Sequence, residues 1–224
     1  MARGDQRMLK FGIIAEGPTD QTVIENILLG YFQNQEEEPS INYIQPPRPL
    51  SEKPGGWTNV FQSLVRKDYE GALQFNDYLV IHIDTDVQEE PGFDVPRLVD
   101  GKEITILERV DKVIVRLRKE IDDDFNRANS HRILFAIAVD TIECWLLPLL
   151  CEGKKVAKIT GCLETANQAL RKANRDGLSA GTKKFIHAYD KASNDYRRRK
   201  NLMACDNKNP SLELFVNQLR ALVV

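Results

Sequence analysis

Residues 77–86 read DYLVIHIDTD, and this stretch decides the fold that we expect. Residues 77–83 are mostly apolar, which is typical of a β-strand that is covered on both faces. The strand ends in Asp84, Thr85 and Asp86, so two carboxylates directly follow a buried strand. In extended backbone, residues two apart point to the same side. We therefore expect Asp84 and Asp86 to face one site and Thr85 to point away from it.

Two further buried strands are predicted on either side of this one. Residues 10–15 (KFGIIA) lead into the turn and helix start EGPTD at 16–20, and residues 132–139 (RILFAIAV) lead into Asp140 and, soon after, Glu143. A short strand is expected at 41–44. Apolar spacings of three and four predict helices at 18–31, 59–73, 107–121 and 142–150. After Cys151 the pattern is helical throughout, ending with a cap at Asn209 and a helix that reaches 222.

Strands that alternate with helices in this order predict an α/β fold. We expect a Rossmann-like, mostly parallel sheet flanked by helices, with a C-terminal helical cap. Residues 1–150 are predicted to form the α/β catalytic domain, and residues 151–224 a basic helical segment packed on it. The 42% hydrophobic and 29% charged residues are ordinary for a globular protein and argue against a disordered chain.

Charge is distributed unevenly along the chain. Residues 1–150 hold 16 Lys and Arg against 26 Asp and Glu, whereas residues 151–224 hold 15 against 7. An acidic body beside a basic segment suggests an acidic site next to a phosphate-binding surface, and mutual neutralisation of the two parts is the alternative.

The expected environment is the cytoplasm. No apolar run approaches the roughly 18 residues that a membrane helix needs, and the start of the chain does not read as a signal peptide. The four cysteines, Cys144, Cys151, Cys162 and Cys205, form no CxxC pair. We therefore expect reduced thiols and no zinc site.

The carboxylates are the strongest functional signal. Glu16, Asp84, Asp86 and Glu143 follow three different buried strands, and the carboxyl ends of parallel strands share one edge of a sheet. Packed carboxylates repel one another unless a cation offsets their charge. Because the ligands are oxygens only, the expected ion is Mg²⁺ or Mn²⁺. The alternative for any single Asp is that it caps a turn after a strand.

At these residues the sequence resembles the Toprim domain. The motif Glu16-Gly17-Pro18-Thr19-Asp20 and the motif Asp84-Thr85-Asp86 match its acidic signature, and AVDTIECWLL at 138–147 is similar to small bacterial DUF4276 and OLD-nuclease-like Toprim proteins. The closing NPSLELFV at 209–216 resembles their last helix, with Leu212 in place of Phe. Asp20 stands where many relatives have Glu.

The resemblance implies a function and roles for these residues. It implies a Mg²⁺-dependent nuclease in which Glu16, Asp84 and Asp86 are catalytic. The implied metal ligands are the same three residues together with Glu143. It also implies a genome-defence setting such as phage defence, with an ATPase partner. A homodimer is a separate expectation. A topoisomerase or primase fits poorly in 224 residues, and no P-loop is present for ATP hydrolysis.

The densest positive stretch is the predicted nucleic-acid surface. Its residues are Lys183, Lys184, Lys191, Arg197, Arg198, Arg199 and Lys200. Phosphate contact would release counterions and favour binding there, and the alternative is a solvated helix face. We expect the interleaved aromatic residues, and also His82 and Trp145, to lie in the core.

Two other functions stay open at this point. The first is a different metal-dependent phosphoryl-transfer enzyme, because D-x-D also begins the HAD phosphatase motif. That motif wants Thr four residues after its first Asp, where this chain has Gln88. The second is a non-catalytic subunit that binds nucleic acid or a partner through the same surface.

Overall fold

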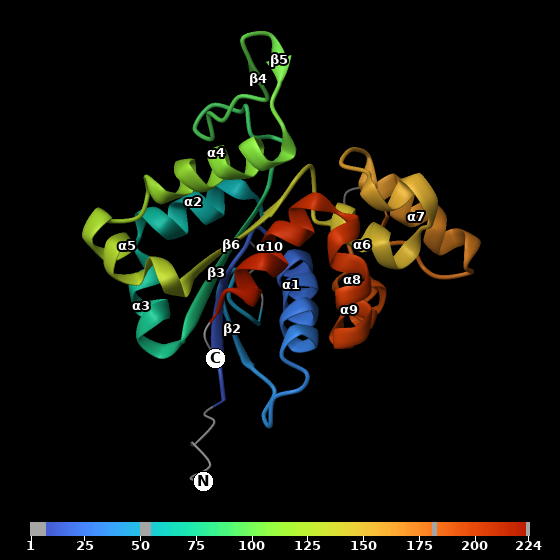
Figure 1. Cartoon of the computed structure of the whole chain (residues 1–224), viewed down its shortest axis with the longest axis horizontal. Helices are drawn as coiled ribbons and strands as arrows, with labels where there is room; N and C mark the ends of the chain where they lie inside the picture. The colour runs from blue at the N-terminus through green and yellow to red at the C-terminus, as the bar shows by residue number, and fades with distance from the viewer. Residues whose placement is uncertain (1–7, 50–54, 181–182, 223–224) are drawn as a thin grey trace.

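The computed structural model describes residues 8–49, 55–180 and 183–222. Its centre is a sheet of four parallel strands in the order β2-β1-β3-β6 (Figure 1). Their bounds are β1 Lys10–Ile14, β2 Ser40–Gln45, β3 Tyr78–Asp84 and β6 Ile133–Ala138. The predicted α/β class with a parallel, helix-flanked sheet is confirmed.

Helices account for most of the remaining described chain. The α-helices are α1 Pro18–Tyr31, α2 Trp57–Val65, α3 Asp68–Phe75, α4 Ile106–Arg118, α5 Asp123–Asn129, α6 Glu143–Leu150, α7 Cys162–Lys172, α8 Ile186–Ser193, α9 Arg199–Cys205 and α10 Pro210–Arg220. Short 3₁₀ helices lie at η1 Ser130–Arg132, η2 Gly153–Ala157, η3 Asn194–Arg197 and η4 Asp206–Lys208. Two small hairpins pair β4 Leu98–Val99 with β5 Lys102–Glu103, and β7 Ser179–Ala180 with β8 Lys183–Lys184.

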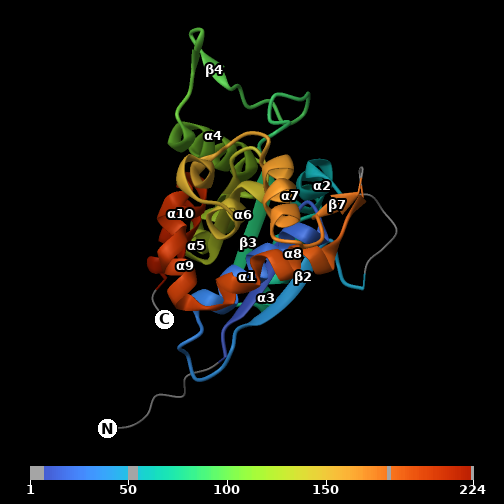
Figure 2. The ribbon, with the colours of Figure 1, turned by 90° about the vertical axis from the view of Figure 1, so that its right-hand side faces the viewer.

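The sheet has a hydrophobic core on each face, because successive side chains of its strands point to opposite sides. Ile13, Val80 and Leu134 belong to the core that α1 and helices α6 to α10 cover. Their neighbours Ile14 and Ile81 belong to the core under α2, α3 and α4. Figures 1 and 2 show these two helical layers with the sheet between them.

The C-terminal segment shares the first of these cores with the sheet domain. Helix α10 runs beside β6, where the side-chain amide of Gln218 donates to Phe135 O at 2.8 Å and accepts from Phe135 N at 2.9 Å. The amide therefore pairs with the edge of the sheet much as a fifth strand would. Asn209 caps α10, accepting from the backbone N–H groups of Ser211 and Leu212, as the sequence predicted.

Three expectations about the elements are wrong. The single helix expected at 59–73 is two helices, α2 and α3, because Lys67 adopts a left-handed conformation with φ of 60° and ends the regular backbone. The chain after Cys151 is not helical throughout, since the β7–β8 hairpin interrupts it. The segment between residues 86 and 107, for which no strand is predicted, contains the projecting β4–β5 hairpin (Figure 1). Both hairpins pair only two residues per strand, too few to show an alternating pattern.

In the described part of the chain, no helix has the length and apolar character needed to cross a membrane.

Candidate metal centre

The candidate site lies where the order of the strands reverses. The chain passes from β1 to β2 in one direction across the sheet and to β3 and β6 in the other, so the switch point is between β1 and β3. Ligands of open α/β sheets bind outside the carboxyl ends of the strands at this point. Glu16 follows β1 and Asp84 ends β3, and Glu16 Oε1 accepts a hydrogen bond from Asp84 N at 2.8 Å. The structure thus brings these two carboxylates side by side.

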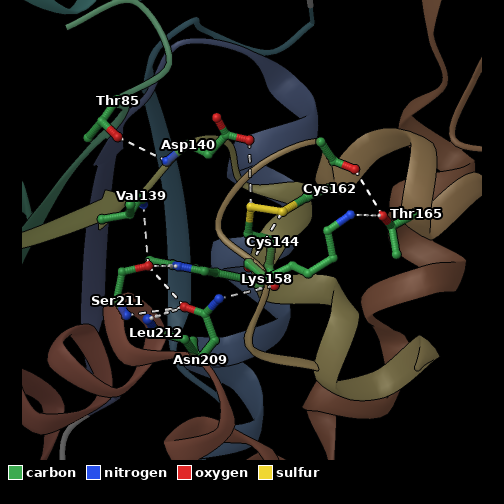
Figure 3. Close-up of a disulfide and its surroundings, with 12 residues drawn as sticks. Thr85, Val139, Asp140, Cys144, Lys158, Cys162, Thr165, Asn209, Ser211 and Leu212 are labelled. Carbon is green, nitrogen blue, oxygen red and sulfur yellow. Dashed lines mark hydrogen bonds between the residues drawn. A yellow bond between two sulfur atoms is a disulfide. The ribbon is translucent and has the colours of Figure 1, made fainter. Parts of the chain in front are cut away.

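The loop after β6 is tied to the loop after β3 by hydrogen bonds. Asp140 has a φ of 67°, and its N–H donates to Thr85 Oγ1 at 2.9 Å (Figure 3). In return, Thr85 N and Asp86 N both donate to Asp140 O, at 3.0 and 3.1 Å. Thr85 therefore points away from the site and into the protein, as its position between two aspartates predicts. These bonds fix the backbone that carries Asp86.

We call Glu16, Asp20, Asp84, Asp86 and Glu143 the acidic cluster. Burial, followed by the charge of Asp20, raises the pKa of Glu16 to about 8. Burial also raises the pKa of Asp20 to about 6 and holds the pKa of Asp84 well above its ordinary value, where the charge of Glu16 adds to the effect. Asp86 is more exposed, and burial raises its pKa as well. Asp20 is not among the site residues predicted from the sequence, although it belongs to the same EGPTD motif as Glu16.

One cation reaches this cluster from the β7–β8 hairpin. Lys184 Nζ lies 2.7 Å from Glu143 Oε1, and the Tyr189 hydroxyl donates to the same oxygen. Burial of Glu143 opposes its ionisation, yet the charge of Lys184 and these hydrogen bonds lower its pKa below the ordinary value. Burial of Lys184 is likewise outweighed by Glu143 and Asp20, which raise its pKa. The sequence predicts Lys184 on a nucleic-acid surface and Tyr189 in the core, and no local pattern predicts that they meet at Glu143.

The chemistry of the cluster fits a hard divalent cation. Asp84 Oδ1 and Glu143 Oε2 are buried and have no hydrogen-bond partner. His82 Nε2 is 3.5 Å from Asp84 Oδ1, but burial lowers the pKa of His82 to about 3, so the imidazole is neutral and does not compensate the carboxylate. Carboxylate oxygens in this number suit Mg²⁺ or Mn²⁺.

The carboxylates do not form a compact cage. Among the described residues, Asp140, Cys144 and Cys162 are the only three potential metal ligands whose donor atoms all lie within 4.8 Å of one another. Glu16, Asp84 and Asp86 therefore do not surround one point as their side chains stand. Mg²⁺ is commonly held by one or two carboxylates and several waters, an arrangement that needs no such cage.

The expectation that all four cysteines are reduced is wrong in this structure. Cys144 and Cys162 form a disulfide that joins the first turns of α6 and α7 (Figure 3). No local pattern predicts this pair, because the two cysteines are 18 positions apart and only the packing of α6 against α7 brings them together. Cys151 and Cys205 are free. Because the sulfurs of Cys144 and Cys162 are bonded to each other, the group of Asp140, Cys144 and Cys162 offers no thiolate to a metal.

A cavity of about 1160 Å³ opens directly beside the acidic cluster. Glu16, Asp20 and Asp84 line its inner part, and Lys183, Lys184 and Arg197 reach it from the predicted basic surface. The other members of that surface, Lys191, Arg198, Arg199 and Lys200, are not among its lining residues. Arg199 instead donates to Tyr31 O at the end of α1, and its guanidinium covers the Tyr31 ring. The predicted surface is therefore divided between the cavity and the outside of the molecule.

The predictions about the core hold in large part. Trp145, His82, Tyr189 and Tyr196 are fully buried, whereas Phe185 is only partly covered. Arg48 also lines the cavity, although it is not among the predicted site residues. The only signal for it in the sequence is its place in the proline-rich stretch PPRPL.

Fold and site together define an α/β protein with a buried acidic cluster at the switch point of a parallel sheet. Comparison of the chain with protein-family models, with curated proteins and with solved structures finds no match. Its function is therefore argued from the site and from the sequence motifs.

Proposed function

We propose that the chain is a Mg²⁺-dependent, Toprim-like nuclease that hydrolyses phosphodiester bonds of DNA or RNA. One observation carries this proposal: Asp84 Oδ1 and Glu143 Oε2 are buried without a hydrogen-bond partner inside a cluster of carboxylates. An unpaired buried carboxylate oxygen is costly. A divalent cation that these oxygens and Asp86 help to hold would remove that cost, and Mn²⁺ would serve in the same way.

The proposed roles follow from where the groups lie. A bound divalent ion supplies charge stabilisation at a phosphoryl oxygen and makes a bound water more acidic. Burial raises the pKa of Glu16 to about 8 in the metal-free protein. A divalent cation beside it would lower that pKa toward neutrality, so the carboxyl group is suited to exchange a proton with the attacking water or the leaving oxygen. Asp84 and Asp86 contribute the negative charge that holds the ion. An ATPase partner and a role in phage defence belong to the same proposal through the Toprim resemblance, and a homodimer is proposed with them.

The test is a cleavage assay on single-stranded and double-stranded DNA and RNA with Mg²⁺ or Mn²⁺. We expect cleavage by the wild-type chain and at least a roughly 100-fold lower rate for Asp84→Asn and for Glu16→Gln. Asp111→Asn, which changes an exposed carboxylate on α4, is the matched control and should cleave like wild type. Equal cleavage by all four proteins would contradict the proposal, as would no cleavage with either metal.

A second function, nucleic-acid binding without catalysis, has one observation in its favour. Lys184 already supplies a positive charge to Glu143, so part of the cluster is compensated without a metal. Titration calorimetry with MgCl₂ separates the two functions. If the chain only binds nucleic acid, titration with MgCl₂ should give no heat of Mg²⁺ binding, and Asp86→Ala should bind a DNA duplex as tightly as wild type.

A further inference from the structure

We propose that the cavity beside the acidic cluster is a subsite for single-stranded nucleic acid, in which an unpaired base stacks on Phe185 and His187 while Arg48, Lys183 and Arg197 contact phosphates. This inference rests on the proposed nuclease function and names its substrate class. It is tested by binding, so that it can fail or stand separately from cleavage.

First, the cavity is continuous with the acidic cluster, because Glu16, Asp20 and Asp84 belong to both. The wall near Glu16 is backbone, since Gly56 N donates to Glu16 O at 3.0 Å. A Cβ on Gly55 would lie only 2.6 Å from that same oxygen, so the backbone at Gly55 and Gly56 packs directly against Glu16. Residues 183–187 also line the cavity. A nucleic-acid strand that lies in the cavity would therefore pass Glu16 and Asp84.

The second step is the depth of the carboxylates. Asp20 and Asp84 are only 4% and 6% exposed, so they lie at the base of the cavity rather than on an open surface. The cavity volume of about 1160 Å³ is close to that of a pocket for a large small-molecule ligand, which suits a few nucleotides. A phosphate within an intact duplex would be held away by the rest of the double helix. Enzymes whose target is a base inside the duplex meet a similar limit, and they act on single strands or on extruded nucleotides.

The third step is an aromatic platform at the rim. Phe185 and His187 both line the cavity, and their ring centroids are 5.8 Å apart with planes tilted by 41°. His187 is exposed and Phe185 is partly exposed, unlike the fully buried Tyr189 and Tyr196 nearby. Aromatic rings in this setting stack on bases of any sequence, and each stacked base contributes about 5- to 100-fold to the binding constant.

The fourth step is the supply of positive charge. The Arg48 guanidinium covers the Tyr43 ring at 3.9 Å and donates to Pro18 O and Thr22 Oγ1 at 2.7 and 2.9 Å. Those acceptors are neutral, so the charge of Arg48 is not cancelled by them. Lys183 is exposed, and its Nζ lies 6.0 Å from the centre of the Phe185 ring.

Arg197 is positioned in a similar way. Its Nε donates to Asn26 Oδ1 at 2.5 Å, and its Nη2 is 3.9 Å from carboxylate oxygens of both Glu25 and Asp190. Glu25 and Asp190 also line the cavity, and their carboxylates offset part of the positive charge of Arg197. We therefore expect Arg48 and Lys183 to contribute more to phosphate binding than Arg197, in contacts that weaken as salt is added.

The test measures fluorescence anisotropy of a labelled oligothymidylate and of its duplex with oligoadenylate, with Ca²⁺ present in place of Mg²⁺. We expect the single strand to bind at least about tenfold more tightly than the duplex. His187→Ala and Phe185→Ala should each weaken binding of the single strand by about fivefold or more. Phe75→Ala, which removes a 75% exposed ring on α3, is the control and should bind like wild type.

Two outcomes would overturn the subsite: equal binding of strand and duplex, or wild-type binding by both the His187 and the Phe185 variants. His187 is exposed, so its variant is expected to fold even if Phe185→Ala does not. A chain that binds the single strand but cleaves nothing would remove the proposed nuclease function and leave the subsite. A chain that cleaves duplex and binds single strands no more tightly than duplex would support the nuclease function and remove the subsite.

Discussion

Lys184 is the residue whose position most changes the chemistry of the site. Its ammonium group and the Tyr189 hydroxyl both bind Glu143 Oε1, while Glu143 Oε2 has no partner. Glu143 is 1% exposed, so its charge depends on these two neighbours. A lysine in this place neutralises a carboxylate that a metal would otherwise have to neutralise. We therefore expect Lys184 and a divalent cation to influence each other.

Replacing Lys184 by Met tests this relation, because Met keeps the length of the side chain and removes the charge. We expect the metal-free variant to lose about 2 kcal/mol of unfolding free energy. This is less than the loss of roughly 3–5 kcal/mol at a fully buried pair, because the Lys184 side chain is 37% exposed. Urea unfolding with and without MgCl₂ measures the effect.

The same experiment has an internal comparison. Mg²⁺ should stabilise Lys184→Met more than wild type, since the variant has an uncompensated carboxylate. Lys183→Met, on the exposed neighbouring position of the hairpin, should unfold like wild type. If Lys184→Met were as stable as Lys183→Met and equally insensitive to Mg²⁺, Lys184 would have no such role.

At the scale of elements, the disulfide holds the helix that carries Glu143. It connects Cys144, the neighbour of Glu143, to the first turn of α7, and α7 leads into the hairpin that carries Lys184. The partners of the Glu143–Lys184 pair are therefore on segments that a covalent bond keeps together. This arrangement favours a fixed geometry at the acidic cluster.

Loss of this bond should lower the stability of the fold. For a loop of 18 residues we expect Cys162→Ser to reduce the unfolding free energy by about 3 kcal/mol, because the unfolded chain regains the freedom that the crosslink removes. Urea unfolding without reductant measures this loss, and Cys151→Ser at a free cysteine is the control.

A chemical count of thiols checks the premise. The denatured wild-type protein should present two reactive thiols before reduction and four afterwards, since the chain has four cysteines and one disulfide. Four reactive thiols in protein purified without reductant would contradict the crosslink.

At the scale of the whole molecule, the acidic cluster makes stability depend on pH. The pKa of Glu16 rises from 4.5 to about 8 on folding, and the pKa of Asp20 rises to about 6. A carboxyl group with a raised pKa binds its proton more tightly in the folded state. The folded state therefore loses relative stability as the pH rises from about 4.5 to about 8.

We accordingly predict that the melting temperature of the metal-free protein falls between pH 5 and pH 8, and that Glu16→Gln makes this fall shallower because Gln does not titrate. Thermal unfolding followed by circular dichroism in EDTA measures it, with Asp111→Asn as the control. A melting temperature that rises over this range in wild type would contradict the raised pKa values.

Much of the sheet was predictable from the sequence, because its strands are long apolar runs that end in acidic residues. The runs before Glu16, Asp84 and Asp140 gave the parallel sheet and the edge at which their carboxylates gather. The switch point itself required the strand order, which no local pattern contains.

The missed features depend on contacts between distant segments. The bond between Cys144 and Cys162 and the pair of Lys184 with Glu143 join segments with no shared motif. Lys67 separates α2 from α3 through a left-handed conformation, which a lysine in the sequence does not predict. Local spacing predicts which residues lie on one strand or helix, and it does not predict which loops meet.

The ring that the disulfide closes has a consequence for limited digestion. Residues 152–155 lie inside this ring and are exposed, so trypsin can reach Lys154 and Lys155. A single cut there would leave both fragments covalently joined through Cys144 and Cys162. The nicked chain should migrate as one band on a denaturing gel and separate into two pieces only when a reducing agent is added.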